Sequence, residues 1–221
     1  MMVDTINDFV DDIARIVRFV RPIDRVRVMT IDTYVRDLVT LKAPDGFPPI
    51  ERLSTNDLAS AHDALAAALM RHHATDRRHL IVAVTNGVDT SSVFDMQTLE
   101  AIAKRASATL HIVTADLFNE SQERIGQAPR YSTRWERRPS AGILSRVWRP
   151  HHDRAFAQQA AVARATGGSW TIPGLLSDQN ASVIFRRFYE RSQRAYRIRY
   201  VPAGVARDGW HDVTVTIPSY P

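Results

Sequence analysis

The spacing of apolar residues along the chain predicts alternating helices and strands. Residues 4–21 place Ile, Val and Phe three and four positions apart, which is typical of a helix with one apolar face. Pro22 is expected to end this helix. Residues 25–31 and 35–41 alternate between apolar and polar, which predicts two strands. Residues 57–71 are rich in Ala and Leu and predict a second helix.

The middle of the chain predicts the centre of a sheet. Residues 79–84, His-Leu-Ile-Val-Ala-Val, form an apolar run, which is typical of a strand buried on both faces. A polar turn, a helix over 94–106 and a second apolar strand over 109–113 follow. Because strands and helices alternate, this order predicts a parallel sheet covered by helices.

The second half of the chain is less regular. Residues 117–150 show little periodicity and are interpreted as a long basic insertion in a single domain spanning 1–221. A helix over 155–164 is expected to end at the glycine pair 167–168, and another helix covers 182–194. Alternating segments around a turn predict a C-terminal β-hairpin over 195–218.

Composition narrows the chemistry. The net charge of +5 and the pI of about 9.9 permit contact with nucleic acids or anionic surfaces without requiring it. The chain has no cysteine, which excludes disulfides, thiolate metal sites and cysteine nucleophiles. We expect no membrane span and no signal peptide in these residues, because no apolar run is long enough.

An ordered set of segments resembles the bacterial von Willebrand factor A-type (VWA-type) domain family. That family has an apolar strand followed by a Thr-Asp-Gly-x-Asp turn, a late helix ending in Thr-Gly-Gly, and a closing hairpin. The matching segments here are 79–84 with the turn 85–92, then 165–168, and last 195–202 with 208–215. The resemblance implies a doubly wound, mostly parallel α/β sheet of the VWA or Rossmann-like kind, which agrees with the periodicity.

The resemblance also implies a metal site that this chain lacks in part. The family holds a cation such as Mg²⁺ with an Asp-x-Ser-x-Ser motif after its first strand, a Thr in a second loop and an Asp in a later turn. Here the Asp-x-Ser-x-Ser motif is absent, the Thr position falls on Ala59 and the Asp position on Asn86. Ser60 and Asp89 are the nearby oxygen carriers. We therefore expect no bound metal or other cofactor, Mg²⁺ being possible only if an upstream strand supplies ligands.

The family's first strand, which lies in the middle of the sheet, has no counterpart in this chain. Three explanations are open: the true start lies further upstream, the chain is a remnant, or another chain donates the strand. The first is favoured, because residue 2 is also Met and the chain opens directly on a helix. Members of the family are commonly exported, but the localisation of this chain is left open.

The sequence gives no support for an enzyme. It contains no Gly-x-Ser-x-Gly elbow, no phosphate-binding glycine loop and no dinucleotide fingerprint. The adjacent histidines, 72–73 and 151–152, are interpreted as solvent-exposed, because neighbours on a helix point about 100° apart. We expect a non-catalytic, adhesion-type module that binds a protein partner of unknown identity.

Two groups of residues are candidates for the binding surface. The first lies at the carboxyl ends of the strands, where open α/β sheets bind partners, and consists of Ser60, Asn86, Asp89 and Ser91. The second lies in the insertion, where Arg134, Trp135 and Trp148 stand among further arginines. Arginine next to aromatic residues also suits nucleobases, so nucleic-acid or anion binding through 117–150 is the alternative function, with an affinity that falls steeply with salt.

Overall fold

The structure is a computed structural model. The described residues are 10, 12–31, 34–51, 60–71, 77–85, 89–114, 143–171, 181–195 and 203–204, with the backbone alone for 143–153 and 181. The predicted hairpin over 195–218 therefore lies almost wholly outside them.

The strands form two groups. β1 (Val26–Ile31) and β2 (Val35–Lys42) pair as an antiparallel hairpin. β3 (His79–Thr85), β4 (Ala108–Thr114) and β5 (Trp170–Thr171) form a parallel sheet with β4 in the centre. The four strands predicted before residue 114 are thus confirmed, and so is the parallel pairing of the two apolar runs.

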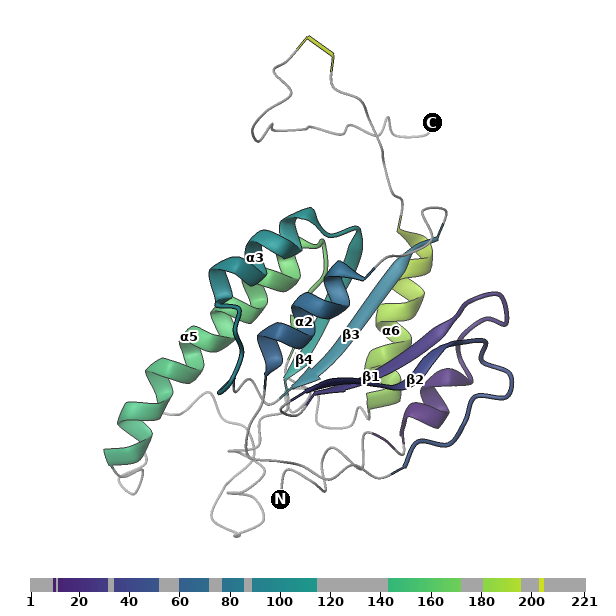
Figure 1. The fold of residues 1–221 in the computed structure, drawn as a ribbon, viewed down its shortest axis with the longest axis horizontal. Coiled ribbons are helices and arrows are strands. Elements are labelled where there is room, and N and C mark those ends of the chain that lie inside the picture. Colours follow the sequence, from purple (N-terminus) through teal and green to yellow (C-terminus); the bar gives the residue numbers. More distant parts are fainter. Residues whose placement is uncertain are drawn as a thin grey trace, which may run out of the picture.

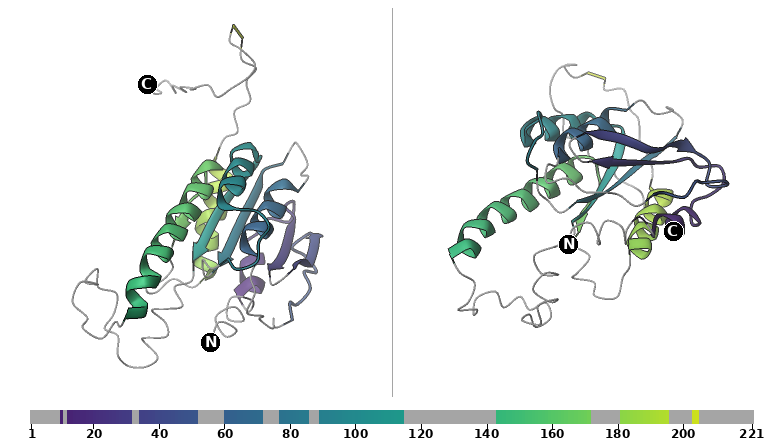
Figure 2. Two further views of the ribbon diagram at one scale, coloured as in Figure 1. Left: turned by 60° about the vertical axis from the view of Figure 1, so that its left-hand side comes forward. Right: turned by 60° about the horizontal axis from the view of Figure 1, so that its bottom comes forward.

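Helices cover the parallel sheet on both faces (Figures 1 and 2). α2 (Ala61–Met70), α3 (Met96–Arg105) and α5 (Ile143–Ala165) lie over one face, and α6 (Ala181–Arg194) contacts β3 from the other. An additional helical segment, residues 12–17, precedes the hairpin. The structure is therefore mixed α/β, with a three-stranded parallel sheet between two layers of helices.

The alternation of side chains along the strands explains this layering. On β3, Ile81 and Ala83 pack against the cluster that contains Leu99 of α3, whereas Val82 packs against the cluster that contains Phe188 of α6. Leu110 of β4 is fully buried, as is Leu99. Because successive side chains of a strand point to opposite faces, an uninterrupted apolar run requires cover on both sides, as this sheet has.

The end of α5 is set by a glycine pair, as the sequence predicts. Gly167 has φ +77°, which places it in the left-handed region where glycine is favoured. Its N–H donates to the Arg164 carbonyl at 2.9 Å, and the Gly168 N–H donates to the Ala163 carbonyl at 3.0 Å. These two bonds form a Schellman motif, which satisfies the last carbonyls of the helix and turns the chain toward β5.

Two expectations need correction, and one strand was not predicted. α5 already begins at Ile143, so the last part of the predicted insertion is helical; Pro150 within it obscured the periodicity. The helix predicted over 4–21 ends at residue 17. The N–H groups of Phe19 and Val20 then bond to carbonyls three residues earlier, as in a 3₁₀ turn. β5 was not predicted, because two residues carry no periodicity of their own.

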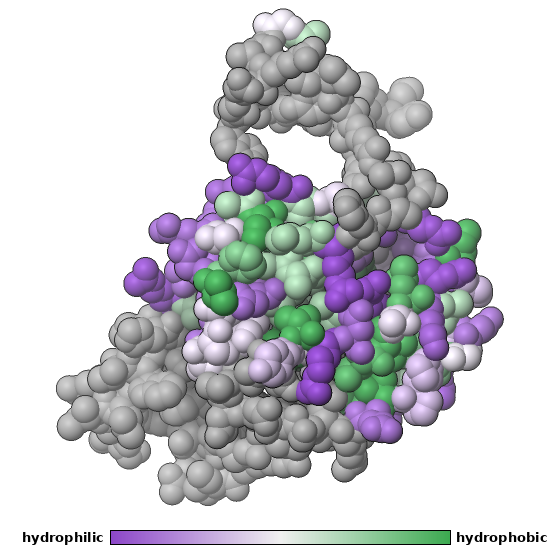
Figure 3. Space-filling view, in the orientation of Figure 1, coloured by the Kyte–Doolittle hydropathy of each residue, from purple (hydrophilic) through white to green (hydrophobic). Residues whose placement is uncertain are grey.

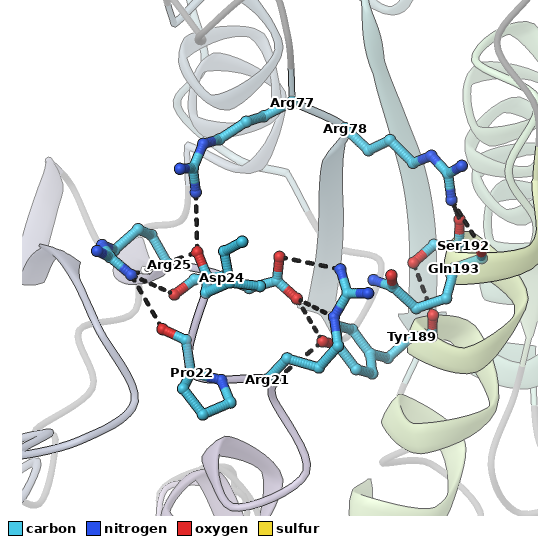
Figure 4. A network of polar contacts seen from close by, with 10 residues as sticks. Arg21, Pro22, Asp24, Arg25, Arg77, Arg78, Tyr189, Ser192 and Gln193 are labelled. Carbon is cyan, nitrogen blue, oxygen red and sulfur yellow. Dashed lines mark hydrogen bonds and ion pairs between the residues drawn. The ribbon is translucent and has the colours of Figure 1, made fainter.

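Polar contacts join the end of α6 to the starts of β1 and β3 (Figure 4). The Tyr189 hydroxyl donates to the Asp24 carboxylate at 2.5 Å, and Arg21 binds the same carboxylate at 2.9 Å. Burial alone would raise the pKa of Asp24, but the bonds from Arg21 and Tyr189 outweigh it and lower that pKa. Arg78, next to β3, donates to the Ser192 and Gln193 carbonyls at 2.7 Å. This network fixes the last described helix to the first hairpin.

Candidate functional site

A cluster of polar side chains lies where the chain leaves the carboxyl end of β3. The loop 89–95, between β3 and α3, rests on the first turn of α2. Hydrogen bonds run both ways between the loop and the helix. We call this arrangement the loop–helix clasp; its polar members are Ser60, His62, Asp63, Asp89, Ser91 and Ser92.

Asp89 holds the N-terminus of α2. Its Oδ1 accepts the His62 backbone N–H at 3.2 Å and the Ser92 hydroxyl at 2.5 Å. Its Oδ2 lies 3.5 Å from the Nδ1 of the His62 ring. The first N–H groups of a helix have no partner within the helix, and its N-terminus favours negative charge. Asp89 therefore acts as a cap supplied from another segment, since Ser60 at the N-cap position makes no side-chain cap bond.

Asp63 holds the loop in return. Its Oδ2 accepts the Val93 N–H and its Oδ1 accepts the Phe94 N–H, both at 2.9 Å. The Asp63 backbone N–H donates to the Ser92 Oγ at 3.1 Å. Because one carboxylate binds two successive N–H groups, the backbone of residues 93 and 94 is held in a fixed orientation.

Two further contacts complete the clasp. The hydroxyls of Ser60 and Ser91 are 2.8 Å apart, and the Ser60 side chain is buried. At the other end of the loop, Asp95 caps α3 by accepting the Thr98 N–H at 2.7 Å. That backbone hydrogen bond lowers the pKa of Asp95. The loop is thus tied to one helix along its length and starts the next.

The structure brings together three of the residues singled out by the sequence. Ser60, Asp89 and Ser91 all belong to the clasp. Asn86, like Ala59, lies outside the described residues, as do Arg134 and Trp135 of the insertion. Trp148 lies on α5, where the backbone alone is described. A ligand-binding role for these residues stays a prediction, and so does the nucleic-acid alternative.

Sequence reasoning missed His62, Asp63 and Ser92 as members of the clasp. The acidic residue in the first turn of α2 was a usable signal, because helix N-termini attract carboxylates. What the sequence did not show is that the Asp63 carboxylate binds the backbone of a loop about thirty residues further on.

The oxygen atoms of the clasp fit a cation poorly. The oxygens of Asp63 and Oδ1 of Asp89 already accept hydrogen bonds from backbone and hydroxyl donors. Among the described residues, no three His, Asp or Glu side chains gather as metal ligands would. A divalent ion would have to displace these donors, and Mg²⁺ also requires near-octahedral oxygen coordination.

The clasp presents apolar side chains outward. Val93 is 89% exposed and Phe94 36% exposed, although the backbone of both is fixed by Asp63. Apolar and polar side chains are interspersed over the face seen in Figure 3. Single exposed apolar residues are common, but one on a rigidly held loop loses little conformational freedom on binding.

Substituting Asp63 tests the clasp directly. We expect Asp63→Ala to lower the free energy of unfolding by about 2 kcal/mol, because two N–H groups lose a charged acceptor. Amide exchange at Val93 and Phe94 should speed up more than exchange within β4. Asp45→Ala, at an exposed site, is the control and should change neither quantity. Unchanged exchange at residues 93 and 94 would contradict this role of Asp63.

Comparisons with known proteins give the following matches. No protein-family model matches the chain, and no curated protein matches it. Among solved structures, it is similar to an aerotolerance-related membrane protein from Bacteroides fragilis, at 12% identity and a TM-score of 0.47, over 86% of this chain and 88% of that one. It is also similar to the conserved hypothetical protein BatB from Bacteroides thetaiotaomicron, at 12% identity and a TM-score of 0.48, over the same shares.

Within the part of the chain that the structure describes, no helix is both long and apolar enough to cross a bilayer.

Proposed function

We propose that the chain is a non-catalytic, VWA-like protein-binding module that contacts its partner through the loop–helix clasp without a metal ion. The observation that carries the proposal is the exposed Val93 on a loop whose backbone is held by the carboxylate of Asp63 on α2. The location of the clasp after the carboxyl end of β3 supports this proposal, since loops at that edge are the usual binding positions in α/β folds. The resemblance of the sequence to VWA-type domains points the same way.

We infer metal independence from the hydrogen bonds that the carboxylate oxygens of the clasp already accept. A family member that uses a cation needs free oxygen atoms at this edge, whereas the carboxylates of Asp63 and Asp89 bind N–H and O–H groups of the chain. The contribution of these groups is to hold the loop in shape. The partner then meets a preformed apolar surface, which limits the entropy lost on association.

A retention experiment tests the proposal. The chain is immobilised and exposed to an extract of the organism that encodes it, once with EDTA and once with Mg²⁺. We expect the same proteins to be retained in both, and Val93→Asp to lower their retention at least about tenfold, because a charge would be buried in the interface. Val183→Asp is the matched control: Val183 is 42% exposed on α6, in the opposite layer, and its substitution should leave retention unchanged.

Three outcomes would contradict this function. Retention that requires Mg²⁺ would contradict the metal-free part. Equal losses for the two Asp variants would place the contact elsewhere or indicate a general loss of structure. No protein retained above the level of an uncoated support would contradict protein binding itself.

A further inference from the structure

The outer face of α6 carries a stripe of arginines. On the inner face of this helix, Ile184 and Phe188 are buried against the sheet. From the second turn onward, the exposed residues are Arg186, Arg187, Glu190, Arg191 and Arg194. Because these positions recur at three- and four-residue spacing, they lie along one side of the helix. That side is therefore basic as far as the end of α6.

Three arginines of the stripe have no partner of opposite charge. Arg186 pairs with Glu190 at 2.7 Å. Among the residues that the structure describes, no carboxylate forms an ion pair with Arg187, Arg191 or Arg194. Like charges three and four positions apart on a helix repel each other and destabilise it. A stripe that costs stability in this way is expected to serve binding, and an anionic ligand would relieve the repulsion.

The segment before β1 adds exposed apolar side chains beside this stripe. It is held to α6 by the network around Tyr189 (Figure 4), and the Arg186 guanidinium lies over the ring of Phe19, 5.4 Å from its centroid. Phe19 is 42% exposed and Ile23 65%. Arg18 is also exposed and forms no ion pair with a described carboxylate. We call the arginine stripe together with residues 18, 19 and 23 the basic face.

We propose that the basic face binds the surface of a membrane that contains anionic lipids. Guanidinium groups form paired hydrogen bonds with phosphate groups, and each basic side chain at such a surface strengthens binding by roughly fivefold. Exposed apolar side chains such as Phe19 and Ile23 are stabilised at the boundary between headgroups and acyl chains. A nucleic acid would also supply phosphates, but it offers an aliphatic side chain far less apolar contact than a lipid surface does.

The position of the basic face leaves the loop–helix clasp accessible. α6 contacts the parallel sheet from one side, whereas α2, which carries Asp63 of the clasp, lies over the other side (Figures 1 and 2). A chain that rests on a bilayer through α6 can therefore still present Val93 to a protein partner. The two surfaces are separate, so this inference does not depend on the proposed function.

Co-sedimentation with lipid vesicles tests the basic face. The chain is mixed with vesicles of phosphatidylcholine, with and without phosphatidylglycerol. We expect binding to the anionic vesicles alone, and its loss at high salt, because salt screens the charges. The triple variant Arg187→Gln/Arg191→Gln/Arg194→Gln should bind them at least about tenfold more weakly. Phe19→Ser, which leaves the charge unchanged, should weaken binding at least about threefold.

A second triple variant is the matched control. Arg105→Gln/Arg154→Gln/Arg164→Gln removes the same charge from exposed positions on α3 and α5, in the opposite layer. Its binding should stay within about twofold of the original, because these side chains face away from the bilayer. Circular dichroism checks that both triple variants are folded. Equal losses in the two would mean that net charge alone attracts the vesicles, and would overturn the proposal.

The remaining outcomes each decide the matter. Equal binding to neutral and anionic vesicles, or binding to neither, would overturn it. A labelled single-stranded oligonucleotide that binds the chain while anionic vesicles do not would assign the arginines to nucleic acid instead. Val93→Ser should leave vesicle binding unchanged; a loss in that variant would contradict a surface separate from the clasp, whereas failed protein retention with intact vesicle binding would contradict the proposed function alone.

Discussion

Gly168→Ala is expected to destabilise the protein by at least about 3 kcal/mol, because the added methyl group has no space. A Cβ on Gly168 would lie 1.8 Å from the Leu110 carbonyl oxygen and 2.6 Å from the carbonyl carbon. Both atoms belong to the backbone of β4, the central strand, which cannot move without breaking its pairing with β3. For a chain of this size, the loss corresponds to a fall of about 10 °C in Tm, measured by circular dichroism.

Gly167→Ala is the matched control for this substitution. Gly167 has φ +77°, but nothing lies within 4 Å of a Cβ at that position. The cost there is conformational and amounts to about 1 to 2 kcal/mol. A loss at Gly168 no larger than the loss at Gly167 would contradict the close approach between the turn and β4.

Acid is expected to destabilise the protein through His111. The ring is buried on β4, stacks on Phe188 of α6 at 4.1 Å and accepts the Ser169 N–H through Nδ1 at 3.2 Å. Burial, with a smaller contribution from the charge of Arg191, lowers the pKa of His111 to about 4. The unfolded chain takes up this proton near pH 6.5, so the contribution of His111 to stability falls as the pH drops from about 6.5 to about 4 and is constant below.

The loss over this range is up to about 3 kcal/mol, from about 1.4 kcal/mol per pH unit. Urea denaturation at several pH values measures it, and the ring signals of His111 in NMR give its pKa directly. His111→Gln should lower the stability at pH 7 but remove this part of the slope, while His62→Gln should retain it. Titration of His111 near pH 6.5 in the folded protein would contradict the prediction.

The elements predicted correctly are those with a strong pattern of their own. β3 and β4 follow from continuous apolar runs, and the end of α5 follows from the glycine pair 167–168. β5 was missed because it has two residues and exists through its pairing with Ile112. The early start of α5 was missed because Pro150 and several arginines interrupt the apolar spacing expected of a helix.

The sequence predicted that three of the candidate residues lie near each other, but it did not predict the hydrogen bonds that they make. Parallel strands end at one edge, which is why Ser60, Asp89 and Ser91 were expected near each other. The sequence does not show that the carboxylate oxygens of Asp63 and Asp89 already accept hydrogen bonds from the chain. The bond from the Val93 N–H to Asp63 spans 30 positions, and such contacts depend on how α2 and the loop pack, not on local pattern.

The network around Tyr189 bears on how the chain reaches its native state. Its bond to Asp24 joins residues 165 positions apart, and Arg78 reaches the Ser192 carbonyl 114 positions along the chain. Contacts of such separation close large loops, and proteins rich in them fold slowly. During synthesis, the bonds of Tyr189 to Asp24 and Arg21 cannot form until α6 has left the ribosome, whereas the bond of Arg71 to Asp37 on β2 can form earlier. The segment that leads into β1 thus acquires its contacts with α6 late, and its apolar side chains stay exposed to aggregation while the chain is incomplete.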